Sequence, residues 1–287
     1  LVPDVVTALQ AFAGAHRARF TYPVIAITGS NGKTTVKEWL VTLLGDDFAV
    51  VKSPQSYNSQ IGVPLSLLQM GPQHNLAIIE AGISKKGEMA KLEKMIRPDY
   101  GILTHFGDAH AEGFADAAEK LTEKLQLFRH TRALIADATD DFVFAQLQAF
   151  VATSPQALET LGYSPAHSHR LTQVHATATS ISAELVRADQ VNALEIPVPG
   201  DAALANAALA ALVAAFLQVD FAKIRLRLPL LRPVSMRMEM ITDNPEVTII
   251  NDAYNADLAS FKNALSLLAT ERYHAARTLV LTDIDHQ

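Results

Sequence analysis

The chain has 287 residues, of which 49% are hydrophobic and 19% are charged, and its formal net charge is −6. This length is sufficient for two domains with a substantial core. Because cysteine is absent, disulfides, cysteine nucleophiles and thiolate metal sites are excluded, and the composition fits a reducing compartment without proving one. The sequence has no block rich in lysine and arginine and no uninterrupted apolar run of membrane-spanning length, so neither nucleic acid nor a membrane is an expected partner.

Apolar runs alternate with helix-like segments from residue 22 to about residue 150. Most of these runs are continuous, which is typical of strands in a parallel sheet covered on both faces. The expected strands are 22–28, 48–52, 75–80, 100–104 and 133–136, and the helices between them begin near Thr34, Gly62, Gly87, Ala115 and Asp141. The pattern predicts a doubly wound α/β fold with a mostly parallel sheet, whose ligands bind beyond the carboxyl ends of the strands.

The second half of the chain is less regular. Residues 158–199 mix short alternating runs with polar breaks, which we interpret as a small antiparallel excursion. A long apolar helix is expected from about 201 to 219, followed by a proline-containing linker over 226–233. Expected strands at 236–242, 247–251 and 278–282, with a helix near 258–269, then form the beginning of a Rossmann-like domain that is too small for a closed core.

The most informative segment is Thr28-Gly29-Ser30-Asn31-Gly32-Lys33-Thr34-Thr35, between the first expected strand and its helix. A glycine-rich turn in this position directs backbone N–H groups and the positive end of the helix toward one point, where a phosphate chain fits. Lys33 adds a positive charge, and the Thr34 hydroxyl is able to ligate Mg²⁺. The usual P-loop has a glycine five residues before Gly32, where this chain has Ile27, so the loop is a shorter variant. It predicts binding of nucleotide phosphates.

Other polar residues follow the expected strands or interrupt apolar helices. Glu80 ends a strand beside the phosphate loop, where it is either a Mg²⁺ ligand or a solvent-facing acid. His110 lies just past another strand and either contacts a metal or phosphate or is merely exposed, and His105 is a weaker candidate. Lys120 and Lys124 share one helix face, which spacing alone assigns to solvent.

Three further candidates come from the second half. Asn206 interrupts the apolar helix, where its amide either contacts an adenine edge or caps a neighbouring backbone. Arg237 either approaches a phosphate from the second domain or lies on an edge strand as a surface residue. Asp252 belongs to an Asn-Asp turn after a strand, which is an ordinary position for both residues.

Taken together, these segments resemble the Mur ligases, the ATP-dependent amide-forming ligases of peptidoglycan precursor synthesis. The resemblance rests on residues 28–35, 56–65, 80–82 with 87–88, 109–114 and 251–255, in the family's order and spacing. The likeness is closest to the members that add D-alanyl-D-alanine to UDP-N-acetylmuramoyl-tripeptide through an acyl phosphate. Residues 80–89 and 110–114 look most like the ligase half of a protein fused to an alanine racemase.

The resemblance implies a cytoplasmic ligase that uses ATP and Mg²⁺. The phosphates and the first Mg²⁺ would be held by Gly29, Ser30, Asn31, Gly32, Lys33, Thr34 and Thr35. Glu80 and His110 would hold a second Mg²⁺ near the γ-phosphate. Lys124 occupies the position of the lysine that is carbamylated in the family. Lys120 would occupy this position if the helix register differs.

The resemblance also assigns residues to the other ligands. Asn206 would contact adenine, Asp252 the ribose and Arg237 the phosphates, while Asn58 would lie toward the muramyl-peptide substrate. Three departures from the family pattern affect these expectations. Ala202-Ala203 stands where His-Asn is common, His105 replaces an asparagine, and Ser59 replaces the second asparagine of the Asn-Asn-x-Ile-Gly-Val-Pro motif.

The family's organisation implies a linker helix over 1–20 from a missing N-terminal domain, a central ATP-binding domain over 21–232, and the start of a truncated C-terminal domain over 233–287. The chain begins at Leu1, without an initiator methionine, so we expect a fragment that is monomeric and inactive in ligation by itself. Two alternatives stay open: a ligase like folylpolyglutamate synthase, and a nucleotide-binding module without ligase activity. The 57–64 segment and the Tyr254-Asn255 turn argue against the first.

Overall fold

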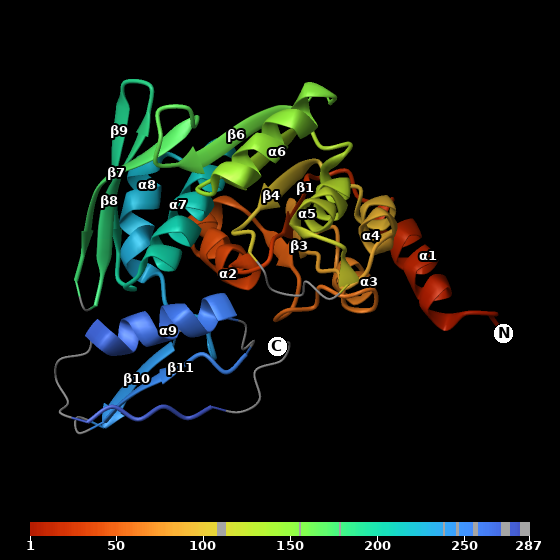
Figure 1. The fold of residues 1–287 in the computed structure, drawn as a ribbon. Helices are drawn as coiled ribbons and strands as arrows, with labels where there is room; N and C mark the ends of the chain where they lie inside the picture. The colour runs from red at the N-terminus through yellow and green to blue at the C-terminus, as the bar shows by residue number, and fades with distance from the viewer. Residues whose placement is uncertain are drawn as a thin grey trace.

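The computed structural model describes residues 1–107, 113–154, 156–177, 179–237, 239–244, 247–254, 258–270 and 276–281. Within these residues, a nine-stranded sheet has the order β2-β3-β1-β4-β5-β6-β7-β8-β9 (Figure 1). Its strands are β1 (Val24–Thr28), β2 (Val50–Lys52), β3 (Leu76–Glu80), β4 (Tyr100–Leu103), β5 (Ala133–Asp137), β6 (Ala157–Gly162), β7 (His169–Ala176), β8 (Ile181–Arg187) and β9 (Gln190–Ile196). The five strands predicted before residue 150 are confirmed, and they pair in parallel.

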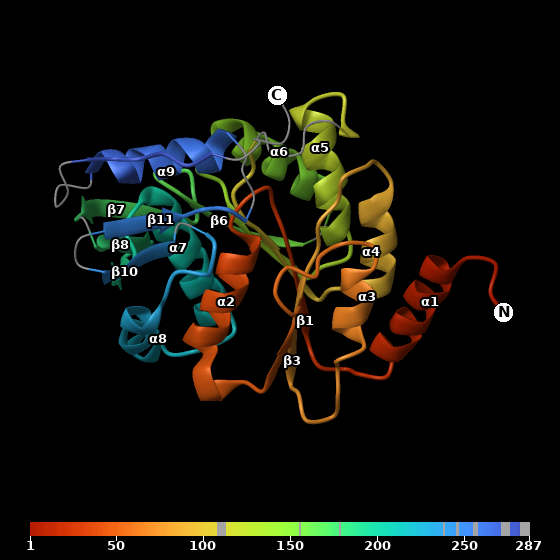
Figure 2. The ribbon, with the colours of Figure 1, turned by 90° about the horizontal axis from the view of Figure 1, so that it is seen from below.

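Helices cover both faces of this sheet (Figure 2). One face carries α2 (Lys33–Leu44) and α7 (Asp201–Phe216), and the other carries α3 (Gly62–Leu67), α4 (Glu88–Ile96), α5 (Ala117–Leu125) and α6 (Asp141–Ala152). Successive side chains of a strand point to opposite faces, so Ile25 and Ile27 join the core with α2 while Val24 and Ala26 join the other core. This double burial is why the strands are continuously apolar, and it confirms the doubly wound fold.

The predicted antiparallel excursion over 158–199 is only partly right. β6 pairs in parallel with β5, and β7 begins in parallel with β6. Only the β7–β8 and β8–β9 pairs are antiparallel, and they extend the main sheet rather than form a separate one. The residues of β8 alternate between buried and partly exposed, because helix α7 covers one face; this one-sided cover produces the alternating sequence pattern.

The predicted linker over 226–233 is wrong. This stretch contains the end of α8 (Phe221–Arg227) and the short 3₁₀ helix η4 (Leu228–Leu230). Leu228 and Leu231 are fully buried, and the Trp39 indole donates a hydrogen bond to the Arg232 carbonyl at 2.7 Å. The two prolines limit the helix without detaching the segment, because Leu228 and Leu231 belong to the core.

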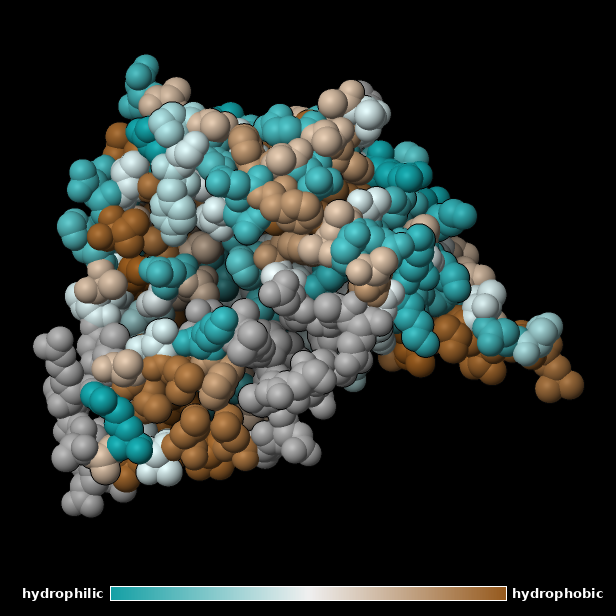
Figure 3. Space-filling model, viewed as in Figure 1, coloured by the Kyte–Doolittle hydropathy of each residue, from teal (hydrophilic) through white to brown (hydrophobic). Residues whose placement is uncertain are grey.

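The last part of the chain contains β10 (Glu239–Asn244), β11 (Val247–Asn251) and α9 (Leu258–Thr270). β10 and β11 pair antiparallel, and β10 begins three residues later than the strand predicted at 236. Residues 278–281 form no strand, so that part of the predicted strand over 278–282 is wrong. Hydrophobic side chains gather on the surface of this last part of the chain in Figure 3. Val247, Ile249 and Leu279 are among its exposed hydrophobic residues. The Rossmann-like domain therefore stays a prediction.

Helix α1 (Val5–Arg17), predicted as a linker helix, packs on α3 and α4. The Arg17 guanidinium is nearly buried and donates hydrogen bonds to the carbonyls of Phe20, Ile96 and Arg97. These contacts fasten α1 to the body of the protein, whereas its proposed origin in another domain stays a prediction. Among the described residues, no helix is both long and apolar enough to cross a membrane.

Candidate active site

The phosphate loop connects β1 to the N-terminus of α2, as predicted. Gly29 has φ +155° and Gly32 has φ +85°, in the region that favours glycine. A Cβ atom on Gly29 would lie 2.0 Å from Thr104 Oγ1, and one on Gly32 would lie 2.3 Å from Asn206 Oδ1. The backbone N–H groups of Ser30 and Asn31 donate to the His105 carbonyl, which ties the loop to the segment after β4. This narrow glycine cradle at the start of a 12-residue helix fits a phosphate chain.

Lys33, the first residue of α2, curls back over this loop. Its Nζ atom donates hydrogen bonds to the carbonyls of Gly29 at 3.0 Å and Ser30 at 2.7 Å. The ammonium group is therefore held at the concave side of the loop, where a phosphate would meet both the charge and the helix end.

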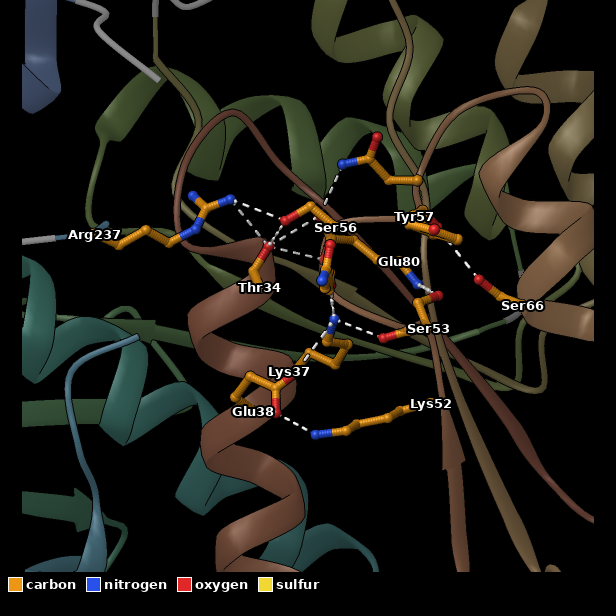
Figure 4. A network of polar contacts seen from close by, with 12 residues as sticks. Thr34, Lys37, Glu38, Lys52, Ser53, Ser56, Tyr57, Ser66, Glu80 and Arg237 are labelled. Carbon is orange, nitrogen blue, oxygen red and sulfur yellow. Dashed lines mark hydrogen bonds and ion pairs between the residues drawn. The ribbon is translucent and has the colours of Figure 1, made fainter. Parts of the chain in front are cut away.

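A cluster of oxygen atoms lies immediately beside the loop (Figure 4). The Thr34 hydroxyl lies 2.9 Å from Ser56 Oγ and 3.0 Å from Glu80 Oε2. Glu80 is fully buried at the carboxyl end of β3, and its Oε1 atom accepts a hydrogen bond from the Asn58 amide at 2.8 Å. The solvent-facing alternative for Glu80 is therefore wrong. The sequence had singled out Thr34, Glu80 and Asn58, and the fold brings these three together.

The oxygen cluster is suited to a hard cation such as Mg²⁺, which prefers few protein ligands together with phosphate and water. Thr34 and Glu80 would hold it, with the Ser56 hydroxyl beside them. No group of three or more His, Cys, Asp or Glu residues that could bind a metal is found in the described ranges. His110, the predicted partner of Glu80, lies outside the described residues. The donors present fit a Mg²⁺ ion shared with a nucleotide.

Lys37 is a site residue that the sequence interpretation missed. Its side chain is fully buried one helical turn after Lys33, and its Nζ atom lies 3.6 Å from Glu80 Oε2. Burial lowers the pKa of Lys37, and the neighbouring carboxylates of Glu80 and Glu38 oppose this shift. The only signal in the sequence was its helical spacing from Lys33, which places both lysines on the side of α2 that faces the strand ends.

Helix α5 presents Lys120 and Lys124 to the site, so the predicted solvent-exposed lysine face is wrong. Both side chains are buried; Lys124 Nζ donates to the Gly29 carbonyl at 3.0 Å, and Lys120 Nζ donates to the Gly107 carbonyl at 2.6 Å. Complete burial, reinforced by the positive charges of Lys33 and Lys120, lowers the pKa of Lys124 well below its ordinary value. Of the two lysines, Lys124 is the one that contacts the phosphate loop.

A cavity of about 470 Å³ opens between the phosphate loop, the residues after β2 and the residues after β3. Lys33 and Lys124 line one part of it, and Asn58 and Gly82 line another. The cavity therefore joins the phosphate end of the site to Asn58, which was predicted to lie toward the muramyl-peptide substrate. Its position beyond the carboxyl ends of the strands is the usual one for a ligand of such a sheet.

The remaining predicted residues approach from α7 and from the last part of the chain. The Asn206 amide of α7 lies against Gly32 of the phosphate loop, and its contact with adenine stays a prediction. Arg237 donates hydrogen bonds to Thr34 Oγ1 and Ser56 Oγ, each at 3.2 Å, and its guanidinium lies 4.1 Å from the centre of the Tyr254 ring. Asp252 lies two residues before Tyr254, directly after β11, and its contact with ribose stays a prediction.

A glycine cradle at a strand–helix junction, with lysine, threonine and a buried acid around it, defines a P-loop nucleotide-binding protein of the α/β class. Residues 27–214 match the family model described as "Mur ligase middle domain". The chain therefore belongs to the Mur ligase family.

The curated relatives point to one branch of this family. The chain is 30% identical over 284 residues to the UDP-N-acetylmuramoyl-tripeptide–D-alanyl-D-alanine ligase of Bacillus subtilis, covering 99% of this chain and 61% of that protein. It is 27% identical over 289 residues to the same ligase of Escherichia coli, covering 99% of this chain and 63% of that protein. The chain thus spans about three fifths of the length of these relatives.

Solved structures show the same likeness. MurF from Acinetobacter baumannii superimposes with a TM-score of 0.86 at 25% identity, over 95% of this chain and 60% of that one. MurF ligase from Thermotoga maritima in complex with ADP gives a TM-score of 0.81 at 25% identity, over 94% of this chain and 62% of that one. Folylpolyglutamate synthase from L. casei gives 0.75 at 16% identity, which indicates a shared fold alone.

Proposed function

We propose that this chain carries the ATP site of a ligase that adds D-alanyl-D-alanine to UDP-N-acetylmuramoyl-tripeptide, forming ADP and phosphate. The observation that carries the proposal is the continuity of the site. One cavity is lined by Lys33 of the phosphate loop, by Lys124 and by Asn58, so a carboxylate bound beside Asn58 would reach the phosphate end. The relatives named above support this choice of substrates.

In the proposed reaction, an oxygen of the tripeptide carboxylate attacks the γ-phosphorus of ATP. The bond from phosphorus to ADP breaks, and an acyl phosphate forms. The amine of D-alanyl-D-alanine then attacks the acyl carbon, phosphate leaves, and an amide bond remains. Lys33 and the backbone N–H groups at the start of α2 stabilise the charge that develops on the transferred phosphoryl group. Bound Mg²⁺, held at Thr34 and Glu80, would neutralise phosphate charge.

The remaining assignments follow the same proposal. Arg237 contributes positive charge from the last part of the chain, where it already contacts the Thr34 hydroxyl. Asn206 contacts the nucleotide from α7, His110 joins Glu80 at the metal, and Asp252 approaches the ribose. The domain limits near residues 20 and 232, a cytoplasmic monomer and a racemase fusion are further expectations of this proposal.

The activity is tested with the product of the complete open reading frame that encodes this chain. Incubation with UDP-N-acetylmuramoyl-tripeptide, D-alanyl-D-alanine and Mg-ATP is expected to yield the pentapeptide product by mass spectrometry, together with ADP. Omission of D-alanyl-D-alanine should remove the product. Ligation of glutamate to tetrahydrofolate in a parallel reaction, without pentapeptide formation, would instead favour the folylpolyglutamate alternative. ADP binding without either ligation would favour the nucleotide-binding module.

Lys124 is expected to be carbamylated. A carbamate forms only on an uncharged amine. Because the pKa of Lys124 is lowered, its amine is uncharged at a lower pH than that of an ordinary lysine. With ¹³C-bicarbonate, the protein should therefore give a carbamate signal in ¹³C NMR that strengthens as the pH rises and the remaining protonated amine loses its proton. Lys124→Ala should remove this signal and abolish ligation in the full-length product.

Lys120→Ala is the control, because it lies on the same helix face. Its carbamate signal should remain but should require a somewhat higher pH, because one of the positive charges that lower the pKa of Lys124 is removed. A signal lost in Lys120→Ala and kept in Lys124→Ala would shift the assignment by one helical turn. No signal in any of the three proteins would contradict carbamylation.

A further inference from the structure

The buried ammonium group of Lys37 has no part in the chemistry described so far. Its side chain has 0% exposure, although lysine is rarely fully buried unless it is paired. Burial of an ammonium group costs several kcal/mol unless oxygen atoms replace its hydration. The arrangement of its partners therefore indicates what the charge does in the folded protein.

The partners of Lys37 belong to three separate elements. Its Nζ atom donates to the Ser53 carbonyl at 2.8 Å and to the Gln55 carbonyl, both in the segment after β2. It lies 3.6 Å from Glu80 Oε2 at the end of β3, and 3.4 Å from Glu38 Oε1 on its own helix. Lys37 thus connects helix α2 to the ends of two neighbouring strands (Figure 4).

The segment held by Lys37 also carries groups of the candidate metal site. The Ser53 hydroxyl accepts a hydrogen bond from the Glu80 backbone N–H at 3.0 Å. Ser56, one residue after Gln55, contacts the Thr34 hydroxyl at 2.9 Å. The orientation of Thr34, Ser56 and Glu80 toward one point therefore depends on a segment that has no regular structure of its own and is tied down by Lys37.

We propose that Lys37 is a positioning residue, which holds Glu80 and the 53–56 segment so that Thr34, Ser56 and Glu80 converge on one Mg²⁺ site. This inference rests on the proposed nucleotide-binding function. Residues behind the direct ligands of a metal commonly determine its affinity in this way. If Lys37 acted through its charge alone, it would weaken Mg²⁺ binding, because an ammonium group repels a cation. Its removal would then raise the affinity for Mg²⁺. The direction of the change in Mg²⁺ affinity therefore separates positioning from simple electrostatics.

The test is binding of a fluorescent ADP analogue to the full chain, titrated with Mg²⁺ and repeated in EDTA. Lys37→Met is expected to raise the half-saturating Mg²⁺ concentration by roughly 10- to 100-fold. Binding in EDTA should stay within about twofold of wild type, because the partners of Lys37 Nζ lie in the 53–55 segment and at Glu38 and Glu80 rather than in the phosphate loop. Lys37→Gln should recover part of the loss, since its amide is able to donate to the Ser53 and Gln55 carbonyls.

Lys52→Met is the matched control, because Lys52 pairs with Glu38 from a partly exposed position; its Mg²⁺ requirement should equal that of the wild type. An unchanged or lower Mg²⁺ requirement in folded Lys37→Met would overturn the proposal, as would equal losses in the Met and Gln variants. If circular dichroism shows that Lys37→Met is unfolded, Lys37→Gln decides: a raised requirement supports positioning, and an unchanged one overturns it. Absence of ADP binding by the wild type would instead overturn the proposed function itself.

Discussion

Lys33→Ala is expected to weaken binding of a fluorescent ATP analogue by roughly 10- to 150-fold in Mg²⁺ buffer. A hydrogen bond from a charged group contributes about 1.5–3 kcal/mol, and about 1.4 kcal/mol corresponds to a tenfold change in affinity. The ammonium group already lies on the loop, at 2.7 Å from the Ser30 carbonyl, so little side-chain ordering opposes its contact with phosphate. Fluorescence titration of the wild type and the variant measures the difference.

Lys94→Ala is the control for the loss of one positive charge, because Lys94 is an exposed residue near the end of α4. Its affinity for the analogue should match that of the wild type. Equal affinities for Lys33→Ala and the wild type would contradict the assignment of Gly29–Lys33 as a phosphate loop. Equal losses in both variants would indicate that only the overall charge of the protein matters.

Gly32→Ala is expected to reduce nucleotide binding by at least roughly tenfold and to lower the melting temperature. A side chain in the left-handed region costs about 1–2 kcal/mol, and the Gly32 backbone has φ +85°. The new methyl group would also lie 2.3 Å from Asn206 Oδ1, in the part of the loop that a phosphate approaches. Calorimetry and titration of the ATP analogue measure the two effects separately.

Gly87→Ala offers a matched comparison. Gly87 also precedes a helix and has a similar φ of +81°, but nothing lies within 4 Å of a Cβ atom built there. This variant should show the backbone strain as a lower melting temperature and keep its nucleotide affinity. In Gly32→Ala/Asn206→Ala the clash with the amide is removed, so stability should partly return while binding stays weak. Restored binding in the double variant would mean that the displaced Asn206 side chain, and not the new methyl group, obstructed the phosphate, and it would contradict a contact of Asn206 with the nucleotide.

Much of the sheet could be predicted from the sequence, because burial on both faces produces continuous apolar runs. The five predicted strands before residue 150 are confirmed for this reason, and the glycine-rich segment was correctly placed between β1 and α2. Glycine carries a local signal of its own: the backbone at Gly32 requires a conformation that other residues avoid. Features determined by the immediate chain neighbourhood were therefore predictable.

The sequence was less informative where the partners are distant along the chain. Residues 226–233 contain two prolines and look like a linker, yet Leu228 and Leu231 belong to a core that includes strand β1 and helix α2, far earlier in the chain. The register of the strands at 158–199 likewise depends on which edge of the sheet is available to pair. Local composition contains neither piece of information.

The active site illustrates the same division. The phosphate loop and the acid at position 80 could be recognised as candidates, because each has a characteristic place at the end of a strand. That Glu80 is buried against Lys37, and that Lys124 rather than Lys120 contacts the Gly29 carbonyl, was decided by the tertiary structure. A lysine on a helix has the same local sequence pattern whether it faces water or a carboxylate. Only the packing of distant elements against the helix buries its side chain and lowers its pKa.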